Sequence, residues 1–373
     1  MYDQPLPQSI LFYLLYGAVT MTAIIASCYL LLRRGNAFAA DSNPPVRLRR
    51  WTAALFASIA LANLWYLPEA FLISSDDIKL TLYIGVTLDF LICFPVAIAV
   101  MFVTLQDRRR PLWPIPLMMA PVVLGMVWCL VSDSEALVQA IFIYLLLLGI
   151  GLMIYILHAL RQYSRWLRDN YADLEHKEVW QTFIVLASIL LMLSYFVCGG
   201  GGTTYEYVLQ ILGFTLIGYL LWRVETLSDL SIAEPQPSVA EDASTTEDVE
   251  KKGLSQATYD NISSLLQRFC IDTQLYLRHD LTLSYLAQVI GTNRTYLTNY
   301  FSDQGITYNT YINNLRINHF VSLYNEAVAK QLPFTAQQLA NDSGYRNYST
   351  FSTAFKERMG QNVTAWMRDK AKG

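Results

Sequence analysis

The sequence contains little charge. Asp, Glu, Lys and Arg together make up 15% of its 373 residues, whereas 54% of the residues are apolar and the mean hydropathy is +0.29. An average soluble domain carries about 25% charged residues. This shortage excludes a chain that is soluble along its whole length, and it predicts a large segment buried in lipid.

Residues arranged for catalysis or metal binding are also scarce. The chain has no HExxH, GxSxG, Walker or CxxC pattern, its four His residues are scattered singly, and its five Cys residues lack the spacing of metal ligands. Four of the Cys residues lie in long apolar runs, where buried and unreactive thiols are the simplest interpretation. We therefore expect no enzyme activity, no catalytic residue, no cofactor and no metal site.

Long apolar runs fill the first 224 residues, and each can cross a hydrocarbon core about 30 Å thick. We predict seven membrane spans: Ile10–Leu32, Trp51–Ile73, Ile78–Leu105, Leu112–Val131, Ala136–Leu160, Val179–Cys198 and Tyr207–Trp222. The first run is not expected to be a cleavable signal, because the leader MYDQPLPQ has no positive charge and a basic pair follows the run. Buried helices of a soluble domain explain seven such runs poorly.

Basic residues between the runs predict an orientation. One alternating set of loops contains twelve Lys and Arg residues, whereas the opposite set contains Lys79 alone. Basic loops remain in the cytoplasm. We therefore expect a multi-pass protein of the bacterial cytoplasmic membrane with its N-terminus outside and its C-terminus in the cytoplasm. Recognition of lipid headgroups is the alternative interpretation of these basic clusters.

A polar segment separates the apolar runs from the rest of the chain. Residues 225–253 contain eight acids before the first base, Lys251, together with Pro, Ser, Thr and Ala. Such a composition does not bury enough apolar surface to fold. It predicts an acidic flexible linker between a membrane domain, residues 1–224, and a C-terminal domain, residues 254–373. In that last domain eleven Lys and Arg residues exceed eight Asp and Glu residues, which suits contact with phosphates.

The C-terminal domain contains one sequence unit twice. LTLSYLAQVIGTNRTYLTNYFSDQGITYNTYI begins at Leu281, and FTAQQLANDSGYRNYSTFSTAFKERMGQNVTAWM begins at Phe334. The equivalent pairs are Leu286 and Leu339, Ala287 and Ala340, Gly291 and Gly344, Asn293 and Asn347, Leu297 and Phe351, Phe301 and Phe355, Gly305 and Gly360, and Tyr311 and Trp366. Their separation grows from 53 to 54 and then 55 residues, so two single-residue insertions are the only slippage.

Each unit has the pattern of two helices joined by a tight turn. A Thr caps the first helix, a Gly permits a positive φ in the turn, and an Asn caps the second helix, whose apolar residues four apart face inward. The three positions are occupied by Thr282, Gly291 and Asn293 in the first unit and by Thr335, Gly344 and Asn347 in the second. Thr335-Ala-Gln-Gln338 also reads as a capping box. We predict helix-turn-helix units at 281–304 and 334–358, joined by a long helix over Tyr308–Ala329.

These units resemble the DNA-binding domain of AraC/XylS-type transcriptional regulators over about Ser255–Lys372. The matching residues include Leu286-Ala287, Tyr296-Leu297, Phe301, Gly305, Tyr311-Ile312, Leu315-Arg316, Leu339-Ala340, Gly344-Tyr345, Phe351, Ala354-Phe355-Lys356, Gly360 and Trp366. The family usually has Phe at the position of Tyr345, a small residue at Phe320 and Pro near Val363. The resemblance implies a tandem helix-turn-helix domain at the C-terminal end. Together with the seven apolar runs, it predicts an all-α chain in which a seven-helix transmembrane bundle precedes that domain.

The resemblance also implies which residues contact DNA. The positions that face bases are Thr295, Thr298 and Asn299 in the first unit and Tyr348, Ser349, Ser352 and Thr353 in the second. Arg294 and Arg346 flank the starts of the recognition helices and suit phosphates, whereas Arg316 in the connecting helix is expected to be structural. A solvated polar surface is the alternative for each single residue, because most protein–DNA contacts go to the backbone.

Together these features predict a membrane-embedded, one-component transcriptional regulator. Its expected partners are double-stranded promoter DNA, membrane lipid, RNA polymerase, an unidentified signal molecule and, in a homodimer, a second copy of the chain. A passive tether needs one span rather than seven, which favours sensing. The alternatives are a purely passive tether and an enzyme or transporter that gates its own regulator.

Three polar residues within the runs form a candidate signal site. Asp89 and Asn63 lie at similar depths in neighbouring spans, and Glu69 lies toward the outer end of the second span. An acid inside a membrane is costly and is a functional hypothesis by default. The alternative is a buried hydrogen bond that only fixes the packing of two helices.

Overall fold

The computed structural model describes residues 10–39, 44–68, 75–132, 135–174, 177–180, 183, 203–230 and 256–372. These residues form helices and connecting segments with no strand among them, which confirms the all-α prediction. The chain divides into two compact units. Unit 1 comprises Met1–Tyr163 and Val179–Ser231, and unit 2 comprises Ser164–Glu178 and Ile232–Gly373.

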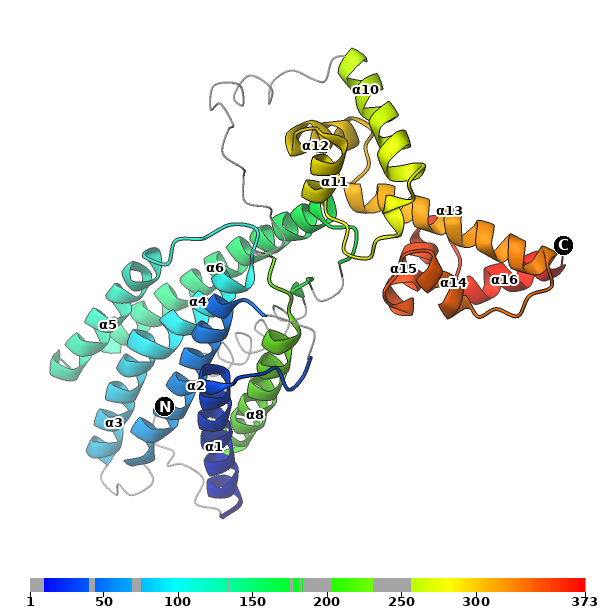
Figure 1. Cartoon of the computed structure of the whole chain (residues 1–373). Coiled ribbons are helices and arrows are strands. Elements are labelled where there is room, and N and C mark those ends of the chain that lie inside the picture. Colours follow the sequence, from blue (N-terminus) through cyan, green and yellow to red (C-terminus); the bar gives the residue numbers. More distant parts are fainter. Residues whose placement is uncertain are drawn as a thin grey trace. The chain divides into compact units, whose positions relative to one another are not determined.

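The described helices of unit 1 form an apolar bundle, drawn from blue to green in Figure 1. They are α1 (Ile10–Leu32), α2 (Val46–Tyr66), α3 (Ser75–Leu88), a π-helix (Asp89–Cys93), α4 (Phe94–Thr104), α5 (Pro114–Ser132), α6 (Glu135–Asn170, whose last turns belong to unit 2) and α8 (Thr203–Thr226). Helix α1 packs against α2 and α8, and α2 also packs against α4. Polar side chains reinforce this packing, since the Ser27 hydroxyl donates to the carbonyl of Ala53 at 2.9 Å.

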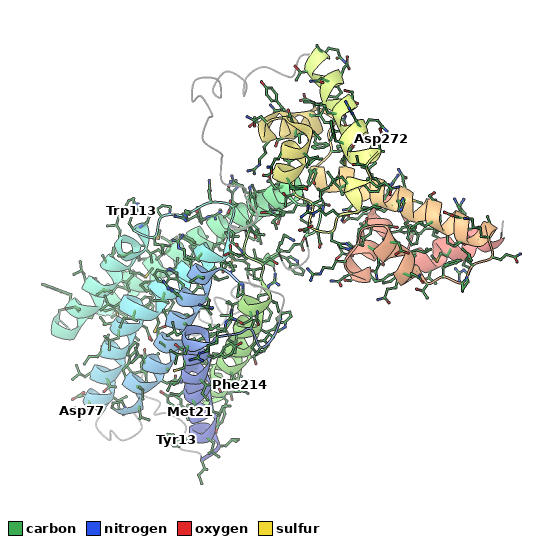
Figure 2. All side chains as sticks on the ribbon, in the orientation of Figure 1. Tyr13, Met21, Asp77, Trp113, Phe214 and Asp272 are labelled. Atoms are coloured by element: carbon green, nitrogen blue, oxygen red, sulfur yellow. The ribbon has the colours of Figure 1, made fainter. Side chains whose placement is uncertain are left out.

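Four of the described helical segments are long and apolar enough to cross a membrane: Ile10–Leu32, Asp76–Thr104, Ala136–Asn170 and Thr204–Thr226. Their outer faces are apolar, as the labelled Met21 of α1 and Phe214 of α8 show, with 57% and 48% of their surfaces exposed (Figure 2). These helices are compatible with membrane insertion. The predicted sixth span lies almost wholly outside the described residues, and the count of seven stays a prediction.

Helix α8 continues past the predicted end of the seventh span. Glu225, which the sequence analysis placed at the start of the linker, is a fully buried residue of α8 that pairs with Arg33 at 3.1 Å. Its backbone carbonyl accepts a hydrogen bond from the Asn36 amide at 2.8 Å. These contacts fix the connection after α1 to the end of α8. Nearly all of the remaining predicted linker lies outside the described residues.

The C-terminal part of unit 2 is a helical domain with two apolar cores. Its helices are α10 (Gln256–Leu266), a π-helix (Gln267–Ile271), a 3-10 turn (Leu275–Leu277), α11 (Leu283–Ile290), α12 (Arg294–Asp303), α13 (Tyr308–Ala329), α14 (Ala336–Asp342), α15 (Tyr348–Met359) and α16 (Val363–Lys372). Helix α13 has the bounds predicted for the connecting helix. Its N-terminal half contributes Tyr308 and Ile312 to the first core, and its C-terminal half contributes Phe320 and Tyr324 to the second.

Candidate DNA-binding site

Helices α11 and α12 form the first helix-turn-helix unit. The Thr282 hydroxyl accepts a hydrogen bond from the N–H of Tyr285 at 3.2 Å and caps α11. Gly291 ends that helix at φ +70°, in the left-handed region that glycine adopts without strain. The side chain of Asn293 then accepts from the N–H of Thr295 at 2.9 Å and caps α12. Both predicted caps and the predicted turn are confirmed here.

Helices α14 and α15 form the second unit, which differs from the first in its caps and in the packing of its turn. Thr335 accepts from the N–H of Gln338 at 3.1 Å, so the first bond of the predicted capping box is present. Gly344 has a φ of +90°, and a Cβ there would lie 2.8 Å from the backbone of Leu277. Asn347 occupies the N-cap position of α15, but its side chain makes no capping bond within the described part of the chain. The prediction of Asn347 as the N-cap residue is therefore confirmed in position, whereas the side-chain bond expected of that cap is absent among the residues that the structure describes.

The inward faces of the two recognition helices, α12 and α15, are fully apolar. Leu297 and Phe301 of α12 are 0% and 2% exposed, and their equivalents Phe351 and Phe355 of α15 are each 0% exposed. Residues four apart lie on one face of a helix, so these anchors fix the rotation of both helices. The remaining polar positions consequently face away from the two cores.

The predicted base-facing residues of α12 lie on its outer side. Thr298 is exposed, and Thr295 and Asn299 are half-buried. The Thr298 hydroxyl donates to the carbonyl of Arg294 at 3.0 Å. This surface offers the amide of one Asn and two hydroxyl side chains to a partner.

The outer side of α15 is similar in character. Arg346, Ser349 and Thr353 are exposed, and Ser352 is half-buried. Tyr348 differs from them, because its ring packs at 5.7 Å from the ring of Phe351 at the edge of the second core. Tyr348 therefore has a packing role in the domain, in addition to any contact with DNA.

Arg316 in α13 is buried, with 1% of its surface exposed. Its Nε donates to the carbonyl of Tyr276 at 2.7 Å and its Nη2 to the carbonyl of Arg278 at 2.6 Å, while its guanidinium lies 5.4 Å from the ring centre of Tyr345. Burial lowers the pKa of Arg316 from its ordinary value. The structure thus gives Arg316 the structural role expected from the sequence, since it joins a residue of the first core to one of the second.

The three departures from the family pattern are all accommodated by packing in the second core. Phe320 is fully buried, with ring centroids 4.5 Å from Phe351 and 5.6 Å from Phe355. Val363 is 1% exposed in the same core. Tyr345 is equally buried, and its hydroxyl has no hydrogen-bond partner among the described residues. The extra oxygen of Tyr345 is therefore the one departure with an evident cost.

Two contacts of the recognition helices were not predicted. Arg294 Nη2 donates at 2.6 Å to the side-chain oxygen of Asn170, which lies 124 residues earlier in the chain. Arg358 at the end of α15 donates to the carbonyl of Asn314 and, at 2.6 Å, to the side chain of Asn318, both on α13. Nothing in the spacing of Asn170 indicated this contact, because the basic residues around it already had an explanation as a cytoplasmic loop.

Two residues of the candidate signal site in unit 1 have separate hydrogen-bond partners. The Asn63 amide donates to the Thr20 hydroxyl at 2.8 Å, whereas Asp89 accepts from the hydroxyl of Tyr66 at 2.7 Å. Gly85 makes room for Tyr66, since a Cβ there would lie 2.4 Å from the tyrosine ring. Asp89 also opens the π-helix, a distortion frequent at functional sites. Glu69 lies outside the described residues.

Comparison with known proteins assigns the C-terminal domain. A family model described as a helix-turn-helix domain matches residues 286–369, which include both recognition helices. No match was found among curated proteins or among solved structures. The match agrees with the caps, turns and cores described above. Residues 286–369 are thus similar to a helix-turn-helix domain, and this similarity supports the assignment of the DNA-binding part of a regulator to the C-terminal domain.

Proposed function

We propose that this chain is a membrane-embedded, one-component transcriptional regulator that binds specific promoter DNA through α12 and α15. The carrying observation is the pair of recognition helices, each fixed by a buried apolar pair and each presenting a polar outer side. The same chain has four helical segments long enough to cross a membrane. This combination favours a regulator that reads DNA without leaving the membrane.

Different residues of the two units would contribute sequence preference and affinity. Asn299 is suited to a bidentate bond with adenine, and the hydroxyls and methyl groups of Thr295, Thr298, Ser349, Ser352 and Thr353 suit several bases. Arg346 is exposed and would contact a phosphate, which contributes affinity without sequence preference. Arg294 would do the same for the first unit.

The membrane part is proposed to contain seven spans, with the N-terminus outside and the DNA-binding domain in the cytoplasm. The excess of Lys and Arg in one set of loops supports this orientation. Reporter fusions after Ser75 or Gly202 should report the external side, and fusions after Arg110 or Arg168 the cytoplasm. A cytoplasmic signal from the Gly202 fusion would contradict the seven-span topology.

The membrane part is further proposed to receive a signal near Asp89. The bond from Tyr66, the space left by Gly85 and the π-helix support a site that rearranges when Asp89 changes partner. Asp89→Asn keeps the shape and removes the charge, and should lock promoter output on or off at a normal protein level. Tyr66→Phe removes only the bonding hydroxyl and should shift output in the same direction. A normal response from both variants would assign Asp89 to packing alone.

The whole proposal is tested by mapping the DNA that the chain occupies in cells. We expect enrichment at a small number of promoters with a shared sequence spanning two neighbouring major grooves, whose centres lie about 34 Å apart. Asn299→Ala should change the occupied sequences at one base position. Occupancy without any shared sequence would contradict the proposed function.

A further inference from the structure

A short segment that begins at the last residue of α6 lies against the first helix-turn-helix unit. This docking segment, Asn170–Ala172, belongs with the DNA-binding domain in unit 2. Tyr171 forms an isolated antiparallel bridge with Thr282, and the N–H of Ala172 donates to the carbonyl of Leu281 at 3.2 Å. The segment thereby pairs with the chain immediately before α11.

Two side chains of the domain hold the same segment. The Asn309 amide at the start of α13 donates to the carbonyl of Ala172 at 2.7 Å and to that of Tyr171 at 3.2 Å. Arg294 at the start of α12 donates to Asn170. Asn170, Tyr171 and Ala172 are 8%, 5% and 2% exposed. Ala172 is also a member of the first apolar core, so the contact is buried rather than peripheral.

The contact occupies a residue that the proposed function assigns to DNA. Nη2 of Arg294 lies 2.6 Å from the Asn170 oxygen, and the same guanidinium would contact a phosphate when α12 enters a major groove. In the docked state the segment also lies against the start of α12, where the phosphate backbone of bound DNA would pass. The docked segment and bound DNA therefore compete for Arg294.

The position of the segment in the chain connects this competition to the membrane part. It begins at the last residue of α6, and α6 contains one of the segments long enough to cross a membrane. A shift at the end of α6 is transmitted through the backbone to Asn170. Hydrogen bonds and burial of Ala172 hold the segment, and such a contact can be populated and released as part of an equilibrium between two states.

We propose that the docking segment is an autoinhibitory contact, which withholds Arg294 and the first recognition helix from DNA until a change in the membrane part releases it. This inference rests on the proposed function, because it identifies what regulates the same DNA-binding surface. It predicts two states of the chain, a docked state with weak DNA binding and a released state with strong binding.

A reversible crosslink tests the competition in the full-length chain. Because the N–H of Ala172 donates to the carbonyl of Leu281, Tyr171 and Thr282 form a non-hydrogen-bonded pair, whose Cα atoms lie about 4.5 Å apart in such ladders. That spacing permits a disulfide. The double variant Tyr171→Cys/Thr282→Cys is therefore expected to crosslink in the docked state, and failure to crosslink would contradict the contact itself.

The release variant is Asn170→Ala/Asn309→Ala, which removes the bonds to the segment and leaves every proposed DNA-contacting residue in place. This variant, in lipid nanodiscs, selects a duplex from a random-sequence library. The affinity of each form for that duplex is then measured by fluorescence anisotropy. The two single-cysteine variants, treated with the same oxidant, control for the native cysteines.

We expect the oxidised double-cysteine variant to bind the selected duplex about tenfold more weakly than its reduced form, a typical size for a coupling between two sites. Reduction should restore binding, and the release variant should bind more tightly than the unmodified chain. Equal affinity of the oxidised and reduced forms would show that the segment is a permanent part of the domain, and would overturn this inference alone. If no form selects any duplex, the proposed function fails and this inference fails with it.

Discussion

The two helix-turn-helix units share one sequence pattern, yet different neighbours complete them. The first unit closes over α10 and over Ala172, a residue far away in the sequence. The second closes over an aromatic cluster of its own, centred on Phe320, Phe351 and Phe355. A repeated pattern therefore specifies the local geometry of helix, turn and helix, whereas it leaves the packing partners of each copy open.

The difference suggests a division of roles within the domain. The buried residues of the second core all come from residues 317–366. The first unit additionally packs against Ala172, in a segment that continues directly from α6. Regulation is therefore expected to act on the first recognition helix, while the second provides constant affinity.

The largest expected effect comes from breaking the link between the two cores. Arg316→Met removes two charged hydrogen bonds to backbone carbonyls, one of them in a buried contact with Tyr276, at a cost of about 3–5 kcal/mol in the free energy of unfolding. Denaturant unfolding of fragment 254–373 measures it through Trp366, the only tryptophan in that fragment. Arg358→Met is the control, because Arg358 is exposed and should cost much less. Equal losses in the two variants would contradict the linking role of Arg316.

The turn glycines provide the next contrast. Gly291→Ala introduces only left-handed strain, about 1–2 kcal/mol, because a Cβ there would meet no described atom within 4 Å. Gly344→Ala adds a clash with the backbone of Leu277, and overpacking of this kind costs about 1–3 kcal/mol more. Thermal unfolding of the two variants compares them directly. If Gly291→Ala proves the more damaging change, the tighter packing assigned to the second turn is wrong.

The caps of the recognition helices should differ in the same experiment. Asn293→Ala removes a bond to the N–H of Thr295 and should lower the free energy of unfolding by about 1 kcal/mol. Asn347→Ala removes no capping bond and should change stability by a few tenths of that amount. A full loss for Asn347→Ala would show that α15 is capped as the sequence pattern predicted.

The smallest expected effect is a gain in the free energy of unfolding. Tyr345→Phe deletes a buried hydroxyl without a partner among the described residues, and removal of such a group is neutral or stabilising by up to about 1 kcal/mol. The phenyl ring retains the contacts with Phe351 and Arg316. A clear loss of stability would indicate that the hydroxyl has a bonding partner that these contacts do not include.

The sequence predicted those features that depend on neighbouring residues. The bounds of α13, the caps at Thr282, Asn293 and Thr335 and the left-handed glycines follow from local backbone chemistry, and each was read correctly. Asn347 occupies the predicted N-cap position, but residue identity alone does not fix the side-chain geometry that a capping bond requires.

Features that depend on distant residues could not be predicted. Asn170 and Arg294 are 124 residues apart, and neither periodicity nor composition connects them. The sequence analysis interpreted Glu225 as one more acid of the polar linker. Its buried ion pair is evident only in the fold, where it lies 3.1 Å from Arg33. Asp89 was identified from its depth, whereas its partner Tyr66 depends on the space left by Gly85.

The central claim, that the two recognition helices read DNA sequence, is tested most directly by selecting duplexes from a random library with the release variant Asn170→Ala/Asn309→Ala. The account predicts one preferred site with two segments about one helical turn apart. Adding Asn299→Ala should lower discrimination at one base position by about 1–3 kcal/mol, whereas adding Arg346→Ala should weaken binding to all duplexes and reduce its salt dependence. Selection of no preferred sequence at moderate salt would contradict the account.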